Sequence, residues 1–505
     1  MSFSELVPFL GWFQSNGGNI DLNAIGFKHF PVAEGGRGAV ALKNFEKGEI
    51  LFTIPRALTL SAKTSSLSEI FGLKIWKERK LDKGWSGLIL CMMWEASQGL
   101  HSRWGPYLAT LPTTFDTPMF WDDSDLKELG GTSVVEKLGK SDAEEDYNNK
   151  VLPAIQSRPD LFPPDAVTVH YSLRQYHIMG SRILSRSFDV ERPDIGDGEA
   201  EEEEETIGNN EANQSMDSAM DVDVQDPTHG AEDDSHPDDD DEDSEEEPNC
   251  VDVSMVPIAD LLNARYGSEN AKLFYDETTL KMMTTKRIKA GEQIWNTYGD
   301  LPNCELIRRY GHVDLLPLPG GRKGNPGDTV EIRADLVVSM FSQESVSVDV
   351  GVSNAQRIDW WLEEGGDDVF VLDTDYNVPE AIISLMRLLY LSAEEWEKAR
   401  TKSKPPKPKL DSHALDLLIL VLRKRLSQYS STIEEDEDIL KNETTLPKNK
   451  YHATVVRLGE KYILAATLDR LSTLRAADNG SSKKRKMTST PNDPNSGKSS
   501  KKSKR

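Results

Sequence analysis

The sequence has few cysteines and no long apolar run. Its three cysteines, Cys91, Cys250 and Cys304, lie far apart and form no Cys-x-x-Cys pair, which excludes a disulfide scaffold and a four-cysteine zinc site. No window reaches the roughly 18 consecutive apolar residues of a membrane span, and residues 1–5 lack the basic region of a secretory signal. We therefore expect a protein of a reducing compartment with no membrane partner and no bound metal.

Basic residues are absent from one long stretch, Asp194 to Cys250, which holds 25 acidic residues. This stretch accounts for nearly all of the net charge of −26, so the rest of the chain is close to balanced. It also has almost no aromatic or branched apolar residues, and burial therefore cannot offset the entropy of ordering it. The sequence predicts a disordered acidic loop at 194–250, which is either a solvated spacer or an attractor of basic proteins.

The C-terminal segment has the opposite charge. Nine basic residues and a single acidic one lie between Lys483 and Arg505, among Ser, Thr, Pro and Asn. The composition predicts a disordered basic tail at 476–505. Nuclear import is the interpretation that we favour, with the cytoplasm as a second location, and a solvated or RNA-contacting tail is the alternative.

Between these segments the sequence predicts an α+β fold. Strand patterns cover 25–32, 38–42 and 49–54, and after the acidic loop they cover 251–256, 271–276, 280–286 and 293–298. Helical spacing of apolar residues covers about 67–100 and 166–188. From Val369 onward the pattern is helical, at 382–390, 414–426 and 451–474. The chain thus divides into a strand-rich part and an α-helical part.

A glycine-rich turn, Glu34-Gly35-Gly36-Arg37-Gly38, separates two of the predicted strands. It is neither a dinucleotide-binding nor a phosphate-binding loop, because no third glycine opens a helix and no Gly-Lys-Ser/Thr follows. Taken alone, it is more often a plain β-turn than a binding site.

Other blocks change that interpretation. They follow the glycine turn in order and are Trp104-Gly105-Pro106-Tyr107-Leu108, Ser185-Arg186-Ser187-Phe188, Pro257-Ile258-Ala259-Asp260-Leu261-Leu262-Asn263, and Asn296-Thr297-Tyr298-Gly299 leading to Tyr310-Gly311. With this ordered set the chain resembles the SET-domain protein lysine methyltransferases, in the branch that includes Rubisco large-subunit methyltransferase and the fungal ribosomal lysine methyltransferases. The resemblance implies a SET-domain β-fold with a helical insert over 1–313 and an all-α substrate-binding domain over 314–475.

The resemblance also implies an activity and a site. The activity is methylation of a protein lysine with S-adenosylmethionine as cofactor. Tyr298 corresponds to the catalytic tyrosine. The expected cofactor-binding residues are Gly36, Arg37, Gly38, Arg186, Asn263, Ala264 and Tyr310, and the expected substrate-binding residues are Trp104, Ser187 and Asp260.

Four of these residues have a structural alternative. Tyr298 could be a core tyrosine at a strand end, Asn263 a turn-former, Trp104 a core residue and Asp260 a helix cap. Most of the family has histidine where this chain has Ala264, so only backbone contacts are expected at that position.

The substrate is the least determined feature. Resemblance to the ribosomal branch and the basic tail favour a ribosomal protein of the large subunit as the partner. The alternative substrates are a histone or another nuclear protein. Two alternative functions of the chain itself are a SET-fold binding adaptor with weak catalysis and an acidic histone chaperone. Nucleic acid contact is expected only through the basic tail.

Overall fold

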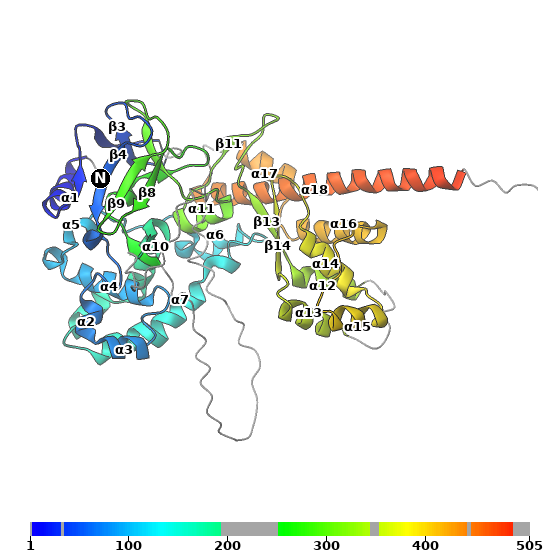
Figure 1. The fold of residues 1–505 in the computed structure, drawn as a ribbon, viewed down its shortest axis with the longest axis horizontal. Coiled ribbons are helices and arrows are strands. Elements are labelled where there is room, and N and C mark those ends of the chain that lie inside the picture. Colours follow the sequence, from blue (N-terminus) through cyan, green and yellow to red (C-terminus); the bar gives the residue numbers. More distant parts are fainter. Residues whose placement is uncertain (1–2, 32–34, 193–250, 344–352, 442–445, 488–505) are drawn as a thin grey trace, which may run out of the picture. The chain divides into compact units, whose positions relative to one another are not determined.

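A computed structural model describes residues 3–31, 35–192, 251–343, 353–441 and 446–487 (Figure 1). The predicted acidic loop at 194–250 lies outside these residues. The chain forms two compact units, of which the first comprises residues 1–128, 134–327 and 447–455, and the second 129–133, 328–446 and 456–505. None of the described helices combines the length and the apolar character that a bilayer crossing requires.

The first unit is built on two four-stranded sheets. One has the order β1-β4-β9-β8 and the other the order β2-β3-β10-β7, in which β7 and β10 run parallel. A third, two-stranded sheet pairs β5 with β6. The strands are β1 (Asn19–Ile20), β2 (Ile25–His29), β3 (Arg37–Ala41), β4 (Ile50–Pro55), β5 (Ser187–Glu191), β6 (Val251–Met255), β7 (Asn263–Ala264), β8 (Ala271–Tyr275), β9 (Thr279–Thr284), β10 (Gln293–Asn296), β11 (Leu316–Pro317) and β12 (Lys323–Gly324).

Helices pack beside these sheets in the first unit (Figure 1). They are α1 (Phe3–Ser15), α2 (Leu67–Phe71), α3 (Leu73–Glu78), α4 (Ser86–Ser97), α5 (Gly105–Leu108), α6 (Asp123–Lys127), α7 (Lys140–Asp146), α8 (Leu152–Ser157), α9 (Pro164–His170), α10 (Leu173–Arg186) and α11 (Asn303–Tyr310). Two predicted long helices are interrupted. Gly72, with φ of 104°, separates α2 from α3, and Ser172 starts α10 anew because its hydroxyl accepts a hydrogen bond from the Gln175 amide.

The second unit is mainly helical. Its helices are α12 (Ala334–Gln343), α13 (Asn354–Glu363), α14 (Glu380–Leu389), α15 (Ala393–Thr401), α16 (Ser412–Leu426), α17 (Ile433–Leu440) and the greater part of α18 (Lys448–Met487). It also contains strands β13 (Thr329–Arg333) and β14 (Val369–Asp373). The helical pattern predicted from Val369 is wrong there, because Phe370 and Leu372 point into the core in strand alternation.

Two predicted boundaries differ from the structure. Residues 314–327 stay with the first unit, since Asn303 Nδ2 donates to the Asp314 carbonyl (3.1 Å) and Asn325 Nδ2 donates to the Leu301 carbonyl (2.8 Å). Helix α18 continues to Met487, so residues 476–487 of the predicted disordered tail are helical. The rest of that tail lies outside the described residues.

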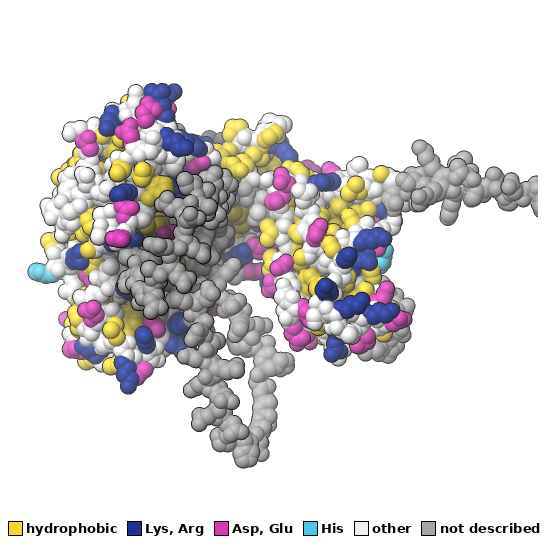
Figure 2. Space-filling model, in the orientation of Figure 1, with side chains coloured by type: hydrophobic (Ala, Val, Ile, Leu, Met, Phe, Trp, Pro, Cys, Tyr) yellow, Lys and Arg dark blue, Asp and Glu magenta, His cyan; other side chains and the backbone are white. Residues whose placement is uncertain are grey.

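Charges of both signs are interspersed on the described surface that Figure 2 shows. This mixture agrees with the near-balanced composition expected for the chain without its acidic loop.

Some helices are stabilised by hydrogen bonds from side chains at their own N-terminus. For example, Ser392 and Glu395 form a capping box that begins α15.

The β5–β6 ladder gives a first prediction. Its last pair is Glu191↔Val251, so the two chain ends that flank residues 193–250 are adjacent. Replacing 193–250 with a four-residue Gly/Ser linker should leave the first unit folded, because a short turn can close a hairpin whose ends already pair. Circular dichroism and thermal unfolding should match those of the full chain. The same deletion combined with Val253→Pro, which breaks the ladder, should lower the melting temperature. An equal decrease of the melting temperature in both variants would contradict the prediction.

Candidate active site

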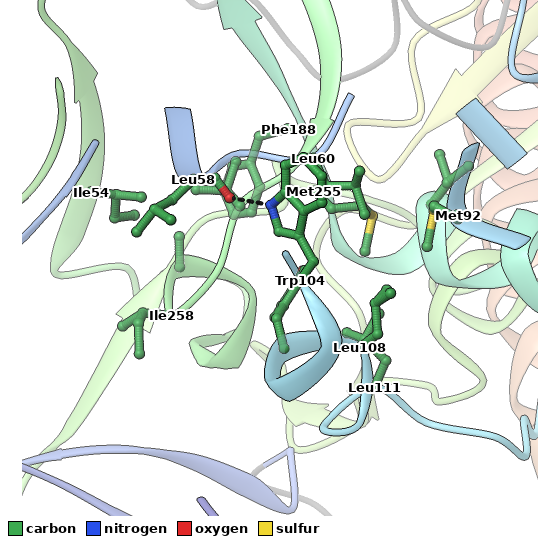
Figure 3. Packing of buried hydrophobic residues seen from close by; sticks show 14 of the residues in the cluster. Ile54, Leu58, Leu60, Met92, Trp104, Leu108, Leu111, Phe188, Met255 and Ile258 are labelled. Carbon is green, nitrogen blue, oxygen red and sulfur yellow. Dashed lines mark hydrogen bonds between the residues drawn. The ribbon is translucent and has the colours of Figure 1, made fainter. Parts of the chain in front are cut away.

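One short segment, residues 257–264, organises the candidate site. Ile258 within it is fully buried and adopts a φ of 73°, a left-handed conformation that a β-branched residue rarely takes. Such a backbone costs on the order of 1–3 kcal/mol and persists only where the surroundings enforce it. Its side chain belongs to the hydrophobic core (Figure 3), so packing holds the strained turn. The strain turns the backbone into the short 3₁₀ helix Ala259–Leu261, which carries Asp260.

Asp260 is a buried carboxylate with charged and polar neighbours. Arg186, the last residue of α10, donates from Nη1 to the Asp260 carbonyl (2.6 Å), and the same nitrogen lies 3.6 Å from Oδ2. The Tyr107 hydroxyl donates to Oδ2 at 3.2 Å. The Asp260 Oδ1 atom is buried and has no hydrogen-bond partner among the described residues. Burial raises the pKa of Asp260, while Arg186 and Arg37 act in the opposite direction.

The capping role proposed for Asp260 is wrong. The residue that caps its 3₁₀ helix is Ile258, and no side chain makes a capping hydrogen bond there. The carboxylate instead faces Arg186 and Tyr107.

Tyr298 lies beside this segment. The sequence predicted that Tyr298 ends a strand. Strand β10 instead ends at Asn296, so Tyr298 lies in the loop that follows the strand. Its hydroxyl donates to the Leu262 carbonyl at 3.2 Å. Its ring stacks on Tyr310, with ring centres 4.3 Å apart and planes 5° from parallel. Burial raises the pKa of Tyr298 to about 12, and Arg186 lowers it by a smaller amount. Tyr298 is therefore a neutral phenol at physiological pH.

Asn263 lies in strand β7 and not in a turn. Its Nδ2 donates to Oε1 of Gln293, on the adjacent strand β10, at 2.8 Å. The glycine turn approaches it closely. A Cβ at Gly35 would lie 2.6 Å from Asn263 Cγ, and a Cβ at Gly38 would lie 2.5 Å from Asn263 Nδ2. The two glycines therefore leave room for this amide.

The remaining members of the glycine turn have other roles. Gly36 adopts a φ of 70° with open space where a Cβ would be, so it serves the turn itself. Arg37 donates from Nη2 to the Thr110 carbonyl at 3.3 Å, and its charge acts on Asp260. Ala264 pairs with Asn296 in the parallel ladder, so its backbone is held by β10.

Two predicted substrate residues lie elsewhere. Trp104 is 2% exposed and packs in the hydrophobic core, where its indole nitrogen donates to the Leu58 carbonyl at 2.9 Å (Figure 3). This is the structural alternative for Trp104, and the structure shows no exposed face of it. Ser187 begins β5 opposite Met255, and it is linked to the site as the neighbour of Arg186 in the chain.

Gln293, which accepts the hydrogen bond of the Asn263 amide, also lines a depression of about 600 Å³. Strand β2 and the segment after it contribute His29 and Phe30, and β10 contributes Gln293 and Trp295. Among the described residues, no group of three or more His, Cys, Asp or Glu side chains is placed to hold a metal ion. Cys91 and Cys304 are buried and form no disulfide within the part of the chain that the structure describes.

The residues present fit a cationic sulfonium cofactor. The unpartnered Asp260 Oδ1 atom and the stacked faces of Tyr298 and Tyr310 both suit positive charge. The missing side chains of Gly35 and Gly38 leave space that the Asn263 amide occupies, beside the same segment. Asn263, Arg186 and Tyr310 are the side chains that would hold S-adenosylmethionine.

Two residues of this arrangement, Tyr107 and Gln293, were not predicted from the sequence. Tyr107 lies in a block that carries the family resemblance, but no spacing singles out its hydroxyl as the partner of Asp260. Gln293 is a polar residue in a strand pattern whose position is 5% exposed. The sequence shows only a polar side chain in a predicted strand, and its burial is known from the structure alone.

Comparison with known proteins agrees with this architecture. The SET domain family model matches residues 36–299, and the model "Rubisco LSMT substrate-binding" matches residues 350–464. Ribosomal lysine N-methyltransferase 4 of Saccharomyces cerevisiae is 33% identical over 287 residues, which cover 55% of this chain and 49% of that protein. The chain thus matches about half the length of this relative. N-lysine methyltransferase setd6 of Xenopus laevis is 26% identical, and the match covers 92% of this chain and 94% of that protein.

Solved structures share the fold. A crystal structure of the SET domain of LSMT bound to methyllysine and AdoHcy superposes with a TM-score of 0.62 at 18% identity, covering 94% of this chain and 93% of that one. Rubisco LSMT bound to AdoMet superposes with a TM-score of 0.61 at 18% identity, covering 94% and 92%.

The fold and the site define a SET-domain transferase, and the chain belongs to the SET-domain family. It is a protein-lysine N-methyltransferase whose cofactor is S-adenosylmethionine.

The buried carboxylate gives a second prediction. Because the folded-state pKa of Asp260 lies above its ordinary value of 3.8, the folded protein loses stability as pH rises through the interval between the two values. Asp260→Asn removes this titration. The free energy of unfolding of the variant minus that of the wild type should therefore increase with pH across the interval, by about 1.4 kcal/mol for each unit of pKa elevation. Urea unfolding at pH 4 to 8 measures it, and a pH-independent difference would refute the assignment.

Proposed function

We propose that this chain methylates a lysine of a ribosomal protein of the large subunit, with Tyr298 as the catalytic residue and Asp260 and Arg186 beside the reacting groups. The observation that carries the residue assignment is the meeting of the Tyr298 hydroxyl, the Leu262 carbonyl and the Asp260–Arg186 pair on one buried segment. The support for the substrate comes from the name of the yeast relative and from charge.

When bound, S-adenosylmethionine would supply an electrophilic methyl group for in-line transfer to a neutral lysine amine, with the sulfonium S–CH3 bond breaking as the N–CH3 bond forms and the amine then releasing a proton. Tyr298 is suited to flank such a methyl. Its hydroxyl hydrogen is directed to the Leu262 carbonyl, which leaves the oxygen lone pairs as acceptors for CH···O contacts. Since its pKa is raised to about 12, Tyr298 acts as a hydrogen-bonding phenol and not as a proton acceptor near neutral pH.

The site must also favour the neutral form of the lysine, whose ordinary pKa is about 10.4. The positive charge of Arg186 and the buried surroundings both disfavour an ammonium ion. Asp260 would favour it when ionised, but burial raises its own pKa and so weakens this effect. Tyr107 and Arg186 hold the carboxylate in one orientation.

An adaptor that keeps the fold without turnover is the competing function. The reason to consider an adaptor is that Ala264 stands where most of the family has histidine. The backbone of Ala264 is paired with Asn296 in the β7–β10 ladder, so a main-chain contact at this position does not depend on the side chain. Calorimetric titration with S-adenosylmethionine separates the two functions, because an adaptor need not bind the cofactor.

Charge and location support a basic partner. The 25 acidic residues between Asp194 and Cys250 speed encounters with basic proteins, an effect that weakens as salt screens it. The nine basic residues near the C-terminus favour a nuclear location, where ribosomal proteins are assembled and histones are also present. Charge therefore supports both substrate classes, and the yeast relative favours the ribosomal one.

A third prediction tests the catalytic residue. Tyr298→Phe should lower kcat by at least about tenfold, which equals roughly 1.4 kcal/mol of transition-state stabilisation, with little change in the Kd of the cofactor. Tyr275→Phe is the matched control. Burial also raises the pKa of Tyr275 to about 12, but this residue lies at the end of β8 and is not among the predicted site residues. Single-turnover methylation and calorimetry provide the two readouts. Wild-type kcat in Tyr298→Phe would remove Tyr298 from the mechanism.

A fourth prediction tests the substrate. In cells that lack this protein, one lysine of a large-subunit ribosomal protein should lose its methylation, as measured by intact-mass and peptide mass spectrometry of ribosomes and histones. Expression of the wild-type chain should restore the mark and Tyr298→Phe should not. If ribosomal lysines keep their methyl groups and a histone lysine loses them, the substrate assignment is wrong and the chemistry stands.

A further inference from the structure

Gln293 contacts the candidate cofactor residue Asn263 from the neighbouring strand. Its Oε1 accepts a hydrogen bond from Asn263 Nδ2 at 2.8 Å, and its side chain is almost completely buried. Parallel pairing of β10 with β7 places Trp295 opposite Asn263, two residues along the same strand from Gln293. The two amides thus meet across adjacent strands of one sheet.

The glycine turn confines this amide pair. A Cβ at Gly38 would lie 2.3 Å from Gln293 Oε1 and 2.5 Å from Asn263 Nδ2, so both amides would have to shift to make room for it. Gly38 does not have a positive φ, so its backbone is open to other residues, and the contact with the two amides is what requires a glycine. Gly35 closes on Asn263 from another direction, where a Cβ would lie 2.6 Å from Cγ.

An asparagine amide has two chemically different ends, and a binding site needs one of them in a defined direction. Without a partner, the Asn263 amide could rotate by half a turn and exchange its donor and acceptor. An acceptor on Gln293 selects the orientation in which Nδ2 faces β10 and Oδ1 faces away from it.

We propose that Gln293 is a positioning residue that fixes the amide orientation of Asn263 for cofactor binding. This inference rests on the proposed cofactor role of Asn263. Gln293 also lines the depression of about 600 Å³, so it connects that depression to the Asn263 amide.

The test compares two substitutions of Gln293 in the full chain. Gln293→Met keeps the length of the side chain but removes the hydrogen-bond acceptor, and it should raise the Kd and KM of S-adenosylmethionine about five- to tenfold, the effect of one lost hydrogen bond and a misoriented amide. The kcat at saturating cofactor should change less than twofold. Gln293→Glu keeps an acceptor oxygen toward Asn263 and should restore most of the affinity.

Controls separate positioning from folding and from the proposed function. Ser268→Ala changes the lining of the same depression outside the amide pair and should leave the Kd unchanged. Thermal unfolding identifies any variant that has lost its structure, and Gly38→Ala, which displaces the same two amides, should weaken cofactor binding in the same way.

Three outcomes would overturn the inference. If Asn263→Ala weakens cofactor binding and Gln293→Met does not, Gln293 does not position the asparagine, although the cofactor role of Asn263 stands. If Gln293→Met and Gln293→Glu lose affinity equally, the acceptor is not what matters. If Asn263→Ala itself binds the cofactor like the wild type, the cofactor role of Asn263 in the proposed function fails and the inference fails with it.

Discussion

The interaction between Asp260 and Arg186 is the constraint on which the site depends. It joins the end of α10 to the segment in which core packing holds Ile258 in a left-handed backbone conformation. Arg186 binds the main-chain carbonyl of Asp260 more closely than the carboxylate, so the pair fixes backbone position first and charge second. A buried ion pair is weak evidence of stabilisation, because desolvation offsets its attraction. Here its effect is to define where Leu262 and Asn263 lie.

The same segment explains the state of the two stacked tyrosines. The Leu262 carbonyl takes the hydrogen of Tyr298, and Tyr310 covers the ring of Tyr298 from α11. Burial is the largest cause of the raised pKa of both phenols. The site therefore presents neutral oxygen acceptors and aromatic faces, which suit a cationic donor, and it contains no phenolate that could serve as a base near neutral pH.

The sequence predicted the fold, because ordered motif blocks report a family even where each block is short. It also named most of the residues that the structure brings together around Asp260 and Asn263, and their roles stay predictions. Contacts that depend on three-dimensional register were not predictable. Tyr107 and Gln293 belong to the site through partners about 150 and 30 residues away, and no local pattern encodes Asp260 or Asn263 as those partners. Trp104 shows the opposite failure, since the motif that contains it reports the family although its indole lies in the core. The strand β14 was missed because Val369–Asp373 is short and lies among helices.

Much of the candidate site is main chain, and this explains which substitutions it tolerates. The Leu262 carbonyl receives Tyr298, the Asp260 carbonyl receives Arg186, and the backbone of Ala264 is held in a parallel ladder with Asn296. None of these three contacts depends on the side chain of the residue that provides it. An alanine at 264 therefore removes an imidazole without moving the strand. By contrast, a Cβ at Gly35 or Gly38 would displace the Asn263 amide, which occupies the space that the Cβ would need. The glycine turn, which is weak evidence as a motif, is thus among the most constrained parts of the site.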